Sequence, residues 1–485
     1  MLISLHPTVT PPDDLFEYGN PDAAASTWEQ PEAWRRLDSF LQETWENRPQ
    51  TEPKYQPELE PEEDNDEGKG KQRYLKTENG RLKAHRFVGT VCFEDATINI
   101  WPRVFEQRFK NAGSDATRAE QRGVMTRNML HWASRADYLK LSPNLGGSSV
   151  PPDISNFFEA YIWLFAQFTC DLLARQPYWQ YQSEIEEGEV LRGRLVMNQY
   201  INDCLARGRW HRLVYEHEPF VFDNLLNRII KRTCQLAQGF CASPTVREKL
   251  GAILFELDEV DDVFCTARDC DRVHLNRMHT EYQIVLDNCR TILAQCQADN
   301  SGRDMKRFCF LLPMDRLFEE YLRVLAGEAL PKGWTFDESQ PYLVPEMNAF
   351  QLRHDLFFRS GQTCVIADAK WKSRVKKGQI WEEKAKQGNN FGVSQSDMYQ
   401  MVAYAHGRGS TEVRLLYPAM GDALPSSHIA TLTTKPGGIS AGSSINVQIH
   451  ELKIHAYPEQ NLAVGEHYTE VEKAIKEAFK SMLSP

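Results

Sequence analysis

The chain has 485 residues, of which 41% are hydrophobic and 25% are charged, so its composition is that of a folded protein large enough for more than one domain. Its net charge of −11 excludes a general polycation, and any binding of nucleic acid must use a local basic surface. The 11 Cys residues are scattered, which indicates reduced and mostly buried thiols. No basic segment followed by an apolar stretch opens the sequence, so we predict a cytoplasmic protein without a signal peptide.

Residues 1–71 form a predicted N-terminal extension. A helix is expected at Pro31–Asn47, and the segment 57–67 holds seven acidic residues, which is typical of a solvated linker. An acidic imitation of DNA charge is the alternative interpretation of that segment. Beyond it, residues 86–105 alternate between apolar and polar side chains, which predicts a β-hairpin with its turn at Glu94-Asp95.

Helical periodicity dominates the next region, up to about residue 300. Its longest apolar run, at residues 157–174, contains the charged residues Glu159 and Asp171 and therefore favours a core helix over a membrane span. The expected helices are 115–139, 153–175, 222–238, 245–256 and 280–297, with extended segments at 190–200 and 213–222.

The C-terminal part alternates between helices and strands. Its order predicts an α/β fold in which helices flank a mixed sheet. The expected elements are a helix at 314–329, a hairpin within 351–372, a helix at 396–407, a strand at 413–417, a strand near 444–454 and a helix near 469–482.

The hairpin within Gln351–Lys372 carries the densest chemistry of the chain. Alternation along a strand places Asp368 and Lys370 on one face, and a turn at Gly361-Gln362 places Asp355 opposite Asp368. Two carboxylates about 5 Å apart repel each other unless a cation such as Mg²⁺ lies between them. The alternative is a salt-bridged hairpin at the edge of a sheet, which spacing alone does not exclude.

Two helices add polar side chains to this interpretation. The helix before the hairpin offers Glu319 and Glu320, of which one would reach the metal and the other would be solvated. In the helix after the hairpin, Gln400 and Tyr404 are four residues apart and share a face, where they can bind a phosphate or orient a side chain. A core position for this pair is the alternative.

Basic residues gather around the hairpin although the chain is acidic. Between Arg353 and Lys386 there are nine basic and four acidic residues. Lys372 and Arg374, in the cluster that follows the hairpin, are candidate contacts to DNA phosphates. A solvated loop is the alternative.

In this order, the residues resemble the PD-(D/E)XK nucleases. The similarity rests on Glu319, Asp355, the run Ala367-Asp368-Ala369-Lys370, and the Gln400-xxx-Tyr404 helix that is typical of RecB-like members. Over residues 72–455 the chain resembles the McrC family, the nuclease subunit of 5-methylcytosine restriction systems, although His354 replaces the proline that usually precedes the first Asp. The other similar segments are 86–104, Leu191–Leu195, Phe222–Lys231, Met314–Glu319 and Asp397–Met401.

The resemblance implies a Mg²⁺-dependent endonuclease that acts on double-stranded DNA, with residues 301–485 as a PD-(D/E)XK nuclease domain. Asp355 and Asp368 would bind the metal together with the carbonyl of Ala369, and Glu319 is a further candidate. Lys370 would orient and activate the attacking water.

The resemblance also implies a partner protein. A hexameric McrB-like AAA+ GTPase ring would select and translocate the DNA, and residues 72–300 would dock on this ring and stimulate it. Arg192, Arg194 and Arg228 are candidate contacts, with local ion pairs as the alternative. No membrane association is expected. A non-catalytic activator of the ring and a standalone RecB-like repair nuclease are the alternative functions.

Overall fold

The chain forms two compact units, one built from Met1–Ala160 and Arg307–Pro485 and the other from Tyr161–Lys306. Both consist of helices and sheets, and the mixed sheets of the first unit are flanked by helices, as the α/β prediction requires. The acidic segment 57–67 and Arg374 lie outside the described residues. The computed structural model describes residues 13–18, 31–47, 72–78, 81–94, 96–136, 150–151, 153–154, 156–295, 307–373, 390–420, 427–434, 444–457 and 464–483.

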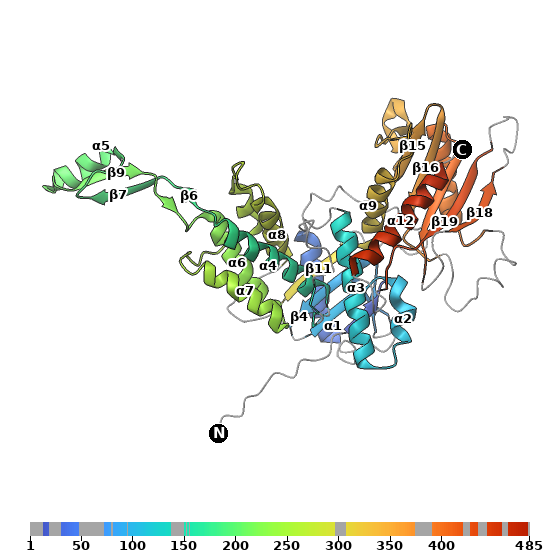
Figure 1. Cartoon of the computed structure of the whole chain (residues 1–485), viewed down its shortest axis with the longest axis horizontal. Coiled ribbons are helices and arrows are strands. Elements are labelled where there is room, and N and C mark those ends of the chain that lie inside the picture. The colour runs from blue at the N-terminus through green and yellow to red at the C-terminus, as the bar shows by residue number, and fades with distance from the viewer. Residues whose placement is uncertain are drawn as a thin grey trace, which may run out of the picture. The chain divides into compact units, whose positions relative to one another are not determined.

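A four-stranded sheet forms the N-terminal part of the first unit (Figure 1). The hairpin predicted around Glu94-Asp95 is confirmed, because Phe93 pairs with Ala96 in an antiparallel ladder. Leu37 of the predicted first helix packs with Ile98 in the core beneath this sheet. In order across the sheet the strands are β1 (Asp13–Phe16), β5 (Ala96–Trp101), β4 (Phe87–Phe93) and β11 (Arg307–Pro313), with α1 (Pro31–Asn47), β2 (Leu75–Glu78) and β3 (Arg81–Ala84) in the same part of the chain.

Strand β11 joins the C-terminal part of the chain to this sheet. It pairs with β4 along its whole length, from Arg307 opposite Phe93 to Pro313 opposite Phe87. The compact units therefore divide the chain at other positions than the predicted docking region at 72–300 and nuclease domain at 301–485, whose roles stay predictions. Periodicity is a local signal, so it could not reveal a pairing between strands so far apart in the chain.

The larger sheet of the first unit contains the predicted catalytic hairpin. The predicted register is confirmed, because Ser360 lies opposite Thr363 and Leu356 lies opposite Ala367. Gly361 in the turn has a φ of +58°, a left-handed conformation that glycine adopts without strain. In order across the sheet the strands are β12 (Thr335–Phe336), β15 (Leu356–Ser360), β16 (Thr363–Ala369), β17 (Glu412–Pro418), β19 (Asn446–Leu452) and β18 (Ser427–Thr433), of which β12 and β18 were not predicted.

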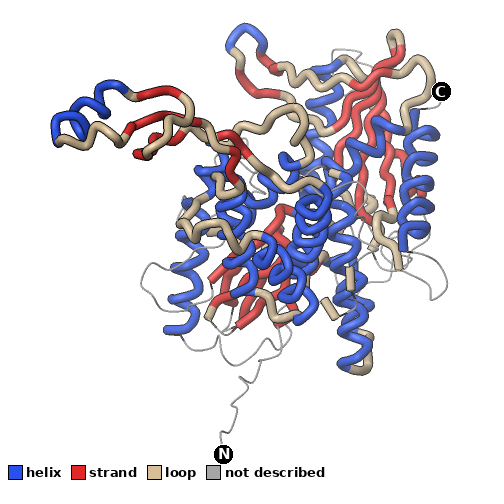
Figure 2. Tube along the Cα trace, turned by 60° about the vertical axis from the view of Figure 1, so that its left-hand side comes forward, coloured by secondary structure: helices blue, strands red, loops and turns tan. Residues whose placement is uncertain are grey.

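Helices cover this larger sheet, as Figures 1 and 2 show. On one face, Met401 of α11 (Gln395–Arg408) joins Ile366 and Leu415 in a hydrophobic core. On the other face, Phe479 of α12 (Val464–Leu483) contacts Phe358, whose neighbour Phe357 belongs to the core on the first face. The remaining elements of this unit include α2 (Glu106–Lys110), α3 (Asp115–Arg135), α9 (Met314–Glu328), α12 (Val464–Leu483), β13 (Tyr342–Val344) and β14 (Ala349–Gln351).

The second unit is mainly helical. The predicted core helix, α4 (Phe157–Arg175), is long and apolar enough to cross a membrane, but 67% of its apolar window is buried inside the structure. Its Tyr161 donates a hydrogen bond of 2.6 Å to Asn288 of α8 (Tyr282–Gln295). This burial is what a core helix requires. The other helices are α6 (Leu225–Phe240), α7 (Pro244–Glu256) and α8 (Tyr282–Gln295).

An arm of short strands, residues 180–221, projects from the helices of the second unit (Figure 1). The extended segment predicted at 213–222 is confirmed by two strands, but the one predicted at 190–200 is largely wrong, since only Arg194–Leu195 is a strand and a short helix follows. Leu191 and Met197 remain exposed in the thin arm, so no core imposes a strand on their alternating pattern. The arm contains β6 (Gln180–Tyr181), β7 (Glu184–Gly188), β8 (Arg194–Leu195), α5 (Met197–Gln199), β9 (Leu213–His217) and β10 (Phe220–Val221).

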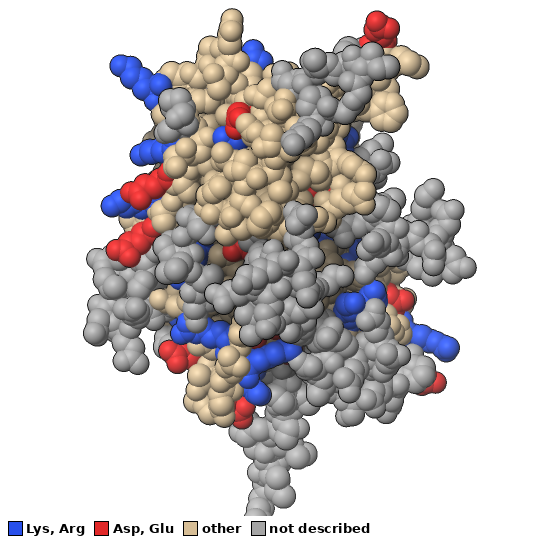
Figure 3. All heavy atoms as spheres, turned by 90° about the vertical axis from the view of Figure 1, so that its right-hand side faces the viewer, with Lys and Arg blue, Asp and Glu red and all other residues tan. Residues whose placement is uncertain are grey.

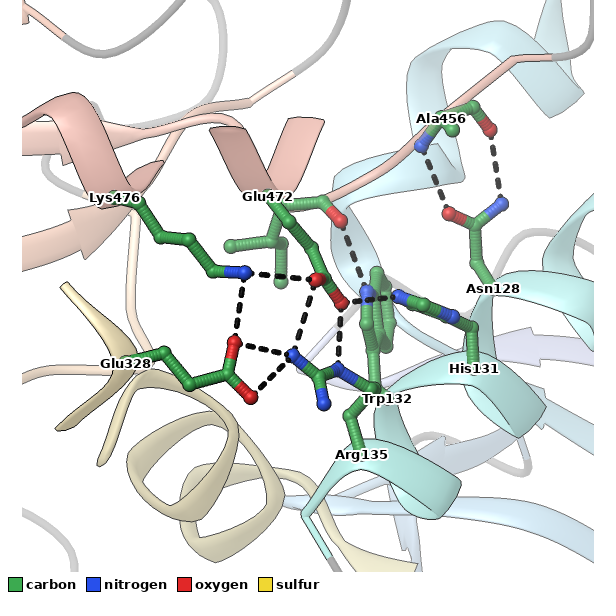
Figure 4. Close-up of polar contacts among 9 residues, drawn as sticks. Asn128, His131, Trp132, Arg135, Glu328, Ala456, Glu472 and Lys476 are labelled. Atoms are coloured by element: carbon green, nitrogen blue, oxygen red, sulfur yellow. Dashed lines mark hydrogen bonds and ion pairs between the residues drawn. The ribbon is translucent and has the colours of Figure 1, made fainter. Parts of the chain in front are cut away.

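A polar network joins three helices of the first unit (Figure 4). Arg135 of α3 donates to Glu472 of α12 at 2.7 Å and to Glu328 of α9 at 2.8 Å. Lys476 lies 2.7 Å from Glu328, and His131 lies 3.0 Å from Glu472. Burial alone would raise the pKa of Glu472, but the contacts with His131 and Arg135 lower it to about 2.

Replacing Glu472 with glutamine should lower the free energy of unfolding by about 2 kcal/mol at neutral pH, because Arg135 would lose its main partner. The pKa of Glu472 falls from 4.5 to about 2, so its contribution is complete above pH 4.5 and disappears as the pH falls toward 2. Denaturant unfolding of both proteins across this range measures the difference. Glu470→Gln, at an exposed position of the same helix, is the control, and an equal loss in both variants would contradict the prediction.

Candidate active site

The hairpin of β15 and β16 brings together the three residues that its spacing predicts to meet. Asp368 lies in β16 with 1% of its side chain exposed, and its Oδ2 is 2.8 Å from the Nζ of Lys370. Asp355 directly precedes β15, and its Oδ2 accepts the backbone N–H of Ala369 at 2.7 Å. The three side chains therefore converge at the C-terminal end of β16.

Helix α11 supplies a chain of hydrogen bonds that orients the lysine. Lys370 Nζ donates to Gln400 Oε1 at 2.8 Å, and Gln400 Nε2 donates to the hydroxyl of Tyr404 at 2.8 Å. The Tyr404 hydroxyl in turn donates to the carbonyl of Arg353 at 2.9 Å. The four-residue spacing of Gln400 and Tyr404 thus lets one residue orient the other. The series of hydrogen bonds ends at Arg353, two residues before Asp355.

Helix α9 directs two neighbouring glutamates into different surroundings. The side chain of Glu320 is 43% exposed and lies 3.5 Å from Arg323. Glu319 is partly buried, and its burial, together with the charges of Asp315 and Asp368, raises its pKa to about 8. Of the two candidates, Glu319 is therefore the one whose pKa is affected by the charges of the site.

The acidic side chains of the site lie near too few positive charges to balance their own. Burial, followed by the charges of Asp368 and Glu319, raises the pKa of Asp355 well above its ordinary value. Burial also raises the pKa of Asp368, although Lys370 opposes this effect. Burial alone would lower the pKa of Lys370, but Asp368 and Asp355 raise it, so the amine stays protonated at neutral pH. One lysine cannot neutralise three acids.

This deficit of positive charge fits a divalent cation. Asp368 Oδ1 is buried and has no hydrogen-bond partner among the described residues. Within the described ranges, no group of three or more His, Cys, Asp and Glu side chains is arranged to hold a metal ion. Mg²⁺ does not require such a group, since it commonly binds one or two carboxylates and completes its shell with water and substrate phosphates. Asp355, Asp368 and the carbonyl of Ala369 therefore fit as its protein ligands.

Lys372 is held at the N-terminus of α11. Its Nζ lies 2.7 Å from Asp397 Oδ2, and Tyr417 donates to the same carboxylate at 3.3 Å. The phosphate contacts predicted for Lys372 and Arg374 stay predictions, because the lysine has an ion-pair partner here and Arg374 is not among the described residues. On the face drawn in Figure 3, the described Lys and Arg side chains alternate with Asp and Glu and do not form one continuous basic surface.

The three predicted partner contacts all lie in the second unit. Arg192 and Arg194 are exposed in the arm, where Arg194 pairs with Glu216. Arg228 of α6 binds Asp223 through two nitrogens, at 2.6 and 2.7 Å. Arg194 and Arg228 therefore form local ion pairs, which was the alternative interpretation for these residues.

His354 occupies the position where the resemblance leads one to expect proline. It is 3% exposed and packs against Phe357 and Tyr404, with ring centroids 5.4 and 6.1 Å apart. Burial, together with the charge of Arg408, lowers its pKa to about 4, so the ring is neutral at physiological pH. The fold therefore accommodates His354 as a neutral, packed side chain next to Asp355 in the sequence.

Two carboxylates close to the site have no predicted role. Asp397 holds Lys372, and its position three residues before Gln400 in α11 was an available signal. Glu17, directly after β1, accepts the indole N–H of Trp371, the residue that follows Lys370. No sequence pattern connects Glu17 to this hairpin.

Comparison with known proteins identifies the family. Residues 82–418 match the family described as McrBC 5-methylcytosine restriction system component, and none of the curated proteins matches the sequence. The fold is similar to the refined half-complex from the tetradecameric assembly of Thermococcus gammatolerans McrB AAA+ hexamers with bound McrC, with a TM-score of 0.70 and 16% identity over 98% of this chain and 100% of that chain. It is also similar to the cryo-EM structure of the Thermococcus gammatolerans McrBC complex, with a TM-score of 0.50 and 19% identity over 66% of this chain and 89% of that chain. Since the family match covers more than half of the sequence, the chain belongs to the family of McrBC 5-methylcytosine restriction system components.

Proposed function

We propose that this chain is the Mg²⁺-dependent endonuclease subunit of a modification-dependent restriction system, with a PD-(D/E)XK nuclease core. The observation that carries the proposal is the meeting of Asp355, Asp368 and Lys370 at one end of β16, with a buried oxygen of Asp368 left without a partner among the described residues. The family membership supports it. The predicted cytoplasmic location suits a protein that attacks incoming DNA.

Hydrolysis of a DNA phosphodiester forms a bond between a water oxygen and phosphorus and breaks one P–O bond to a sugar. When bound, Mg²⁺ would offset the negative charge that develops on the phosphate oxygens. Asp355 and Asp368 would hold the ion. Lys370, kept protonated by the two aspartates and oriented by Gln400, would place the attacking water and stabilise the developing charge.

The proposed partner is an AAA+ NTPase ring. In the Thermococcus gammatolerans assembly, McrC is bound to McrB AAA+ hexamers. The arm of this chain is the candidate docking element, because Tyr181, Trp210 and Phe220 are 68%, 71% and 53% exposed there. Apolar side chains that find no core within the arm indicate a protein partner. Arg192 and Arg194 lie on the same arm, whereas Arg228 is held by Asp223 and is a weaker candidate.

A non-catalytic activator of the ring is the second candidate function. The exposed arm would serve this function equally well, since docking requires no chemistry at the hairpin. The complete set of Asp355, Asp368 and Lys370 speaks against it, because an activator has no need of ionisable groups that are buried, as Asp368 is, or partly buried, as Asp355 and Lys370 are, at a cost in free energy.

The test is a cleavage assay of the chain purified together with the AAA+ NTPase that is proposed as its partner. We expect double-stranded methylated DNA to be cut only when the partner, Mg²⁺ and GTP or ATP are all present. Stimulated NTPase activity without cleavage would support the activator instead. Cleavage by the isolated chain, without partner or nucleotide, would support a standalone repair nuclease.

A further inference from the structure

Glu17 is a fully buried carboxyl that reaches the candidate active site from a distant part of the sequence. Its backbone N–H donates to the carbonyl of Trp101 at 3.1 Å, which fixes the residue at the end of the sheet. Its Oε1 accepts the backbone N–H of Arg103 at 3.1 Å and the indole N–H of Trp371. Its Oε2 has no hydrogen-bond partner within the described ranges.

Trp371 connects Glu17 to the site. It directly follows Lys370, whose backbone N–H donates to the carbonyl of Leu416 at 2.8 Å. The indole ring lies 5.1 Å from the ring of Phe318, the residue next to Glu319 on α9. The hydrogen bond to Glu17 and the contact with Phe318 both restrain the ring, and they thereby restrain the chain as it leaves β16.

We propose that Glu17 is a positioning residue of the nuclease centre, which acts through Trp371 to hold the Ala369 carbonyl and the Lys370 amine in place. This inference rests on the proposed nuclease function. Residues that orient metal ligands from behind typically contribute about 10-fold to 100-fold in metal affinity or activity. Glu17 lies before the residues 82–418 that match the family.

The surroundings of Glu17 allow a conservative replacement. Burial raises the pKa of Glu17 to about 8, while its hydrogen bonds to Arg103 and Trp371 oppose this rise. The carboxyl is therefore mostly uncharged at pH 7. Glutamine has the same shape, is also neutral, and keeps an acceptor oxygen for both N–H donors. Alanine removes the acceptor, and phenylalanine at position 371 removes the donor but keeps an aromatic ring on Phe318.

The test compares Glu17→Ala, Trp371→Phe and Glu17→Gln in the complex with the AAA+ partner. We expect the first two variants to lower kcat for DNA cleavage by about tenfold or more and to raise the Mg²⁺ concentration needed for half-maximal cleavage, with little change in KM for DNA. Glu17→Gln should behave like the wild type at pH 7. The double variant Glu17→Ala/Trp371→Phe should cleave DNA no more slowly than the slower of the two single variants, because each single substitution already removes the same hydrogen bond between Glu17 and Trp371. Calorimetric titration with Mg²⁺ alone gives a second readout.

Asp14, in the strand β1 that directly precedes Glu17, provides a matched control. It also accepts an indole N–H, from Trp101 at 2.8 Å, and it pairs with Arg122 at 2.6 Å, and neither of these partners belongs to the hairpin. Asp14→Ala should lower the melting temperature and leave the Mg²⁺ requirement unchanged.

Three results would overturn the inference. In the first, Trp371→Phe uses Mg²⁺ like the wild type, a comparison that stands even where Glu17→Ala fails to fold. In the second, Asp14→Ala shifts the Mg²⁺ requirement as much as Glu17→Ala does. In the third, the wild-type complex neither binds Mg²⁺ nor cuts DNA, which removes the proposed function and this inference together. The first two leave the nuclease function intact, so the two failures are distinguishable.

Discussion

The Asp368→Asn variant should cleave DNA at least about 10³-fold more slowly than the wild type, while its assembly with the AAA+ partner is retained. Asp368 is buried, contacts Lys370 at 2.8 Å and supplies the carboxylate oxygen that has no other partner among the described residues. Asparagine has nearly the same volume, so it removes the charge that would hold the metal without opening a cavity. Single-turnover cleavage and NTPase activity, measured on one preparation, separate catalysis from assembly.

A matched pair on α9 controls for general disturbance near the site. Glu319→Gln should slow cleavage, because a Mg²⁺ ion bound at the site would favour the ionised form of Glu319, whose pKa responds to the charge of Asp368, and an amide cannot ionise. Glu320→Gln should leave the rate unchanged, because its side chain is exposed and pairs only weakly with Arg323 at the surface. Wild-type rates for Asp368→Asn and Lys370→Met would rule out this hairpin as the catalytic site.

The arrangement of the hairpin could be predicted from the sequence because its determinants are local. A two-residue turn at Gly361-Gln362 sets the register, and strand alternation then places Asp355 opposite Asp368 and Lys370 beside it. The pairing of Ser360 with Thr363 agrees with this prediction. The Gln400–Tyr404 pair is local in the same way, since a helix brings residues four apart onto one face.

Features that depend on distant segments could not be predicted. The side of α9 that faces the hairpin decides between Glu319 and Glu320, and helical periodicity alone does not determine how a helix packs against a particular sheet. Strand β11 pairs with β4, and Glu17 contacts Trp371, only because the chain returns to its N-terminal sheet after the second unit. The compact units differ from the predicted domain boundaries for the same reason.

The contribution of the acidic side chains of the site to the stability of the metal-free protein should fall as the pH rises from about 4.5 to about 8, and saturating Mg²⁺ should reverse this loss. The folded state raises the pKa of Glu319 from 4.5 to about 8, and it also raises those of Asp355 and Asp368. Within this window these groups keep protons in the folded protein that the unfolded chain has released, so their contribution to stability declines with rising pH, and the part that belongs to Glu319 is lost by about pH 8. Mg²⁺ binds the ionised carboxylates, so it should stabilise the protein most near pH 8, where the acidic side chains destabilise the metal-free protein most.

Glu319→Gln isolates one part of this effect. The neutral amide should raise the melting temperature of the metal-free protein by a few degrees at pH 8 and change it little near pH 4.5, where Glu319 is already protonated in the folded state. Glu320→Gln should follow the wild-type profile, since its side chain is exposed. Melting curves in the presence of a chelator and of Mg²⁺ measure both differences, and parallel profiles for Glu319→Gln and the wild type would show that Glu319 is not part of the acidic cluster. Because this measurement requires neither DNA nor the partner ring, it tests the charge deficit of the site independently of the reaction that the site is proposed to catalyse.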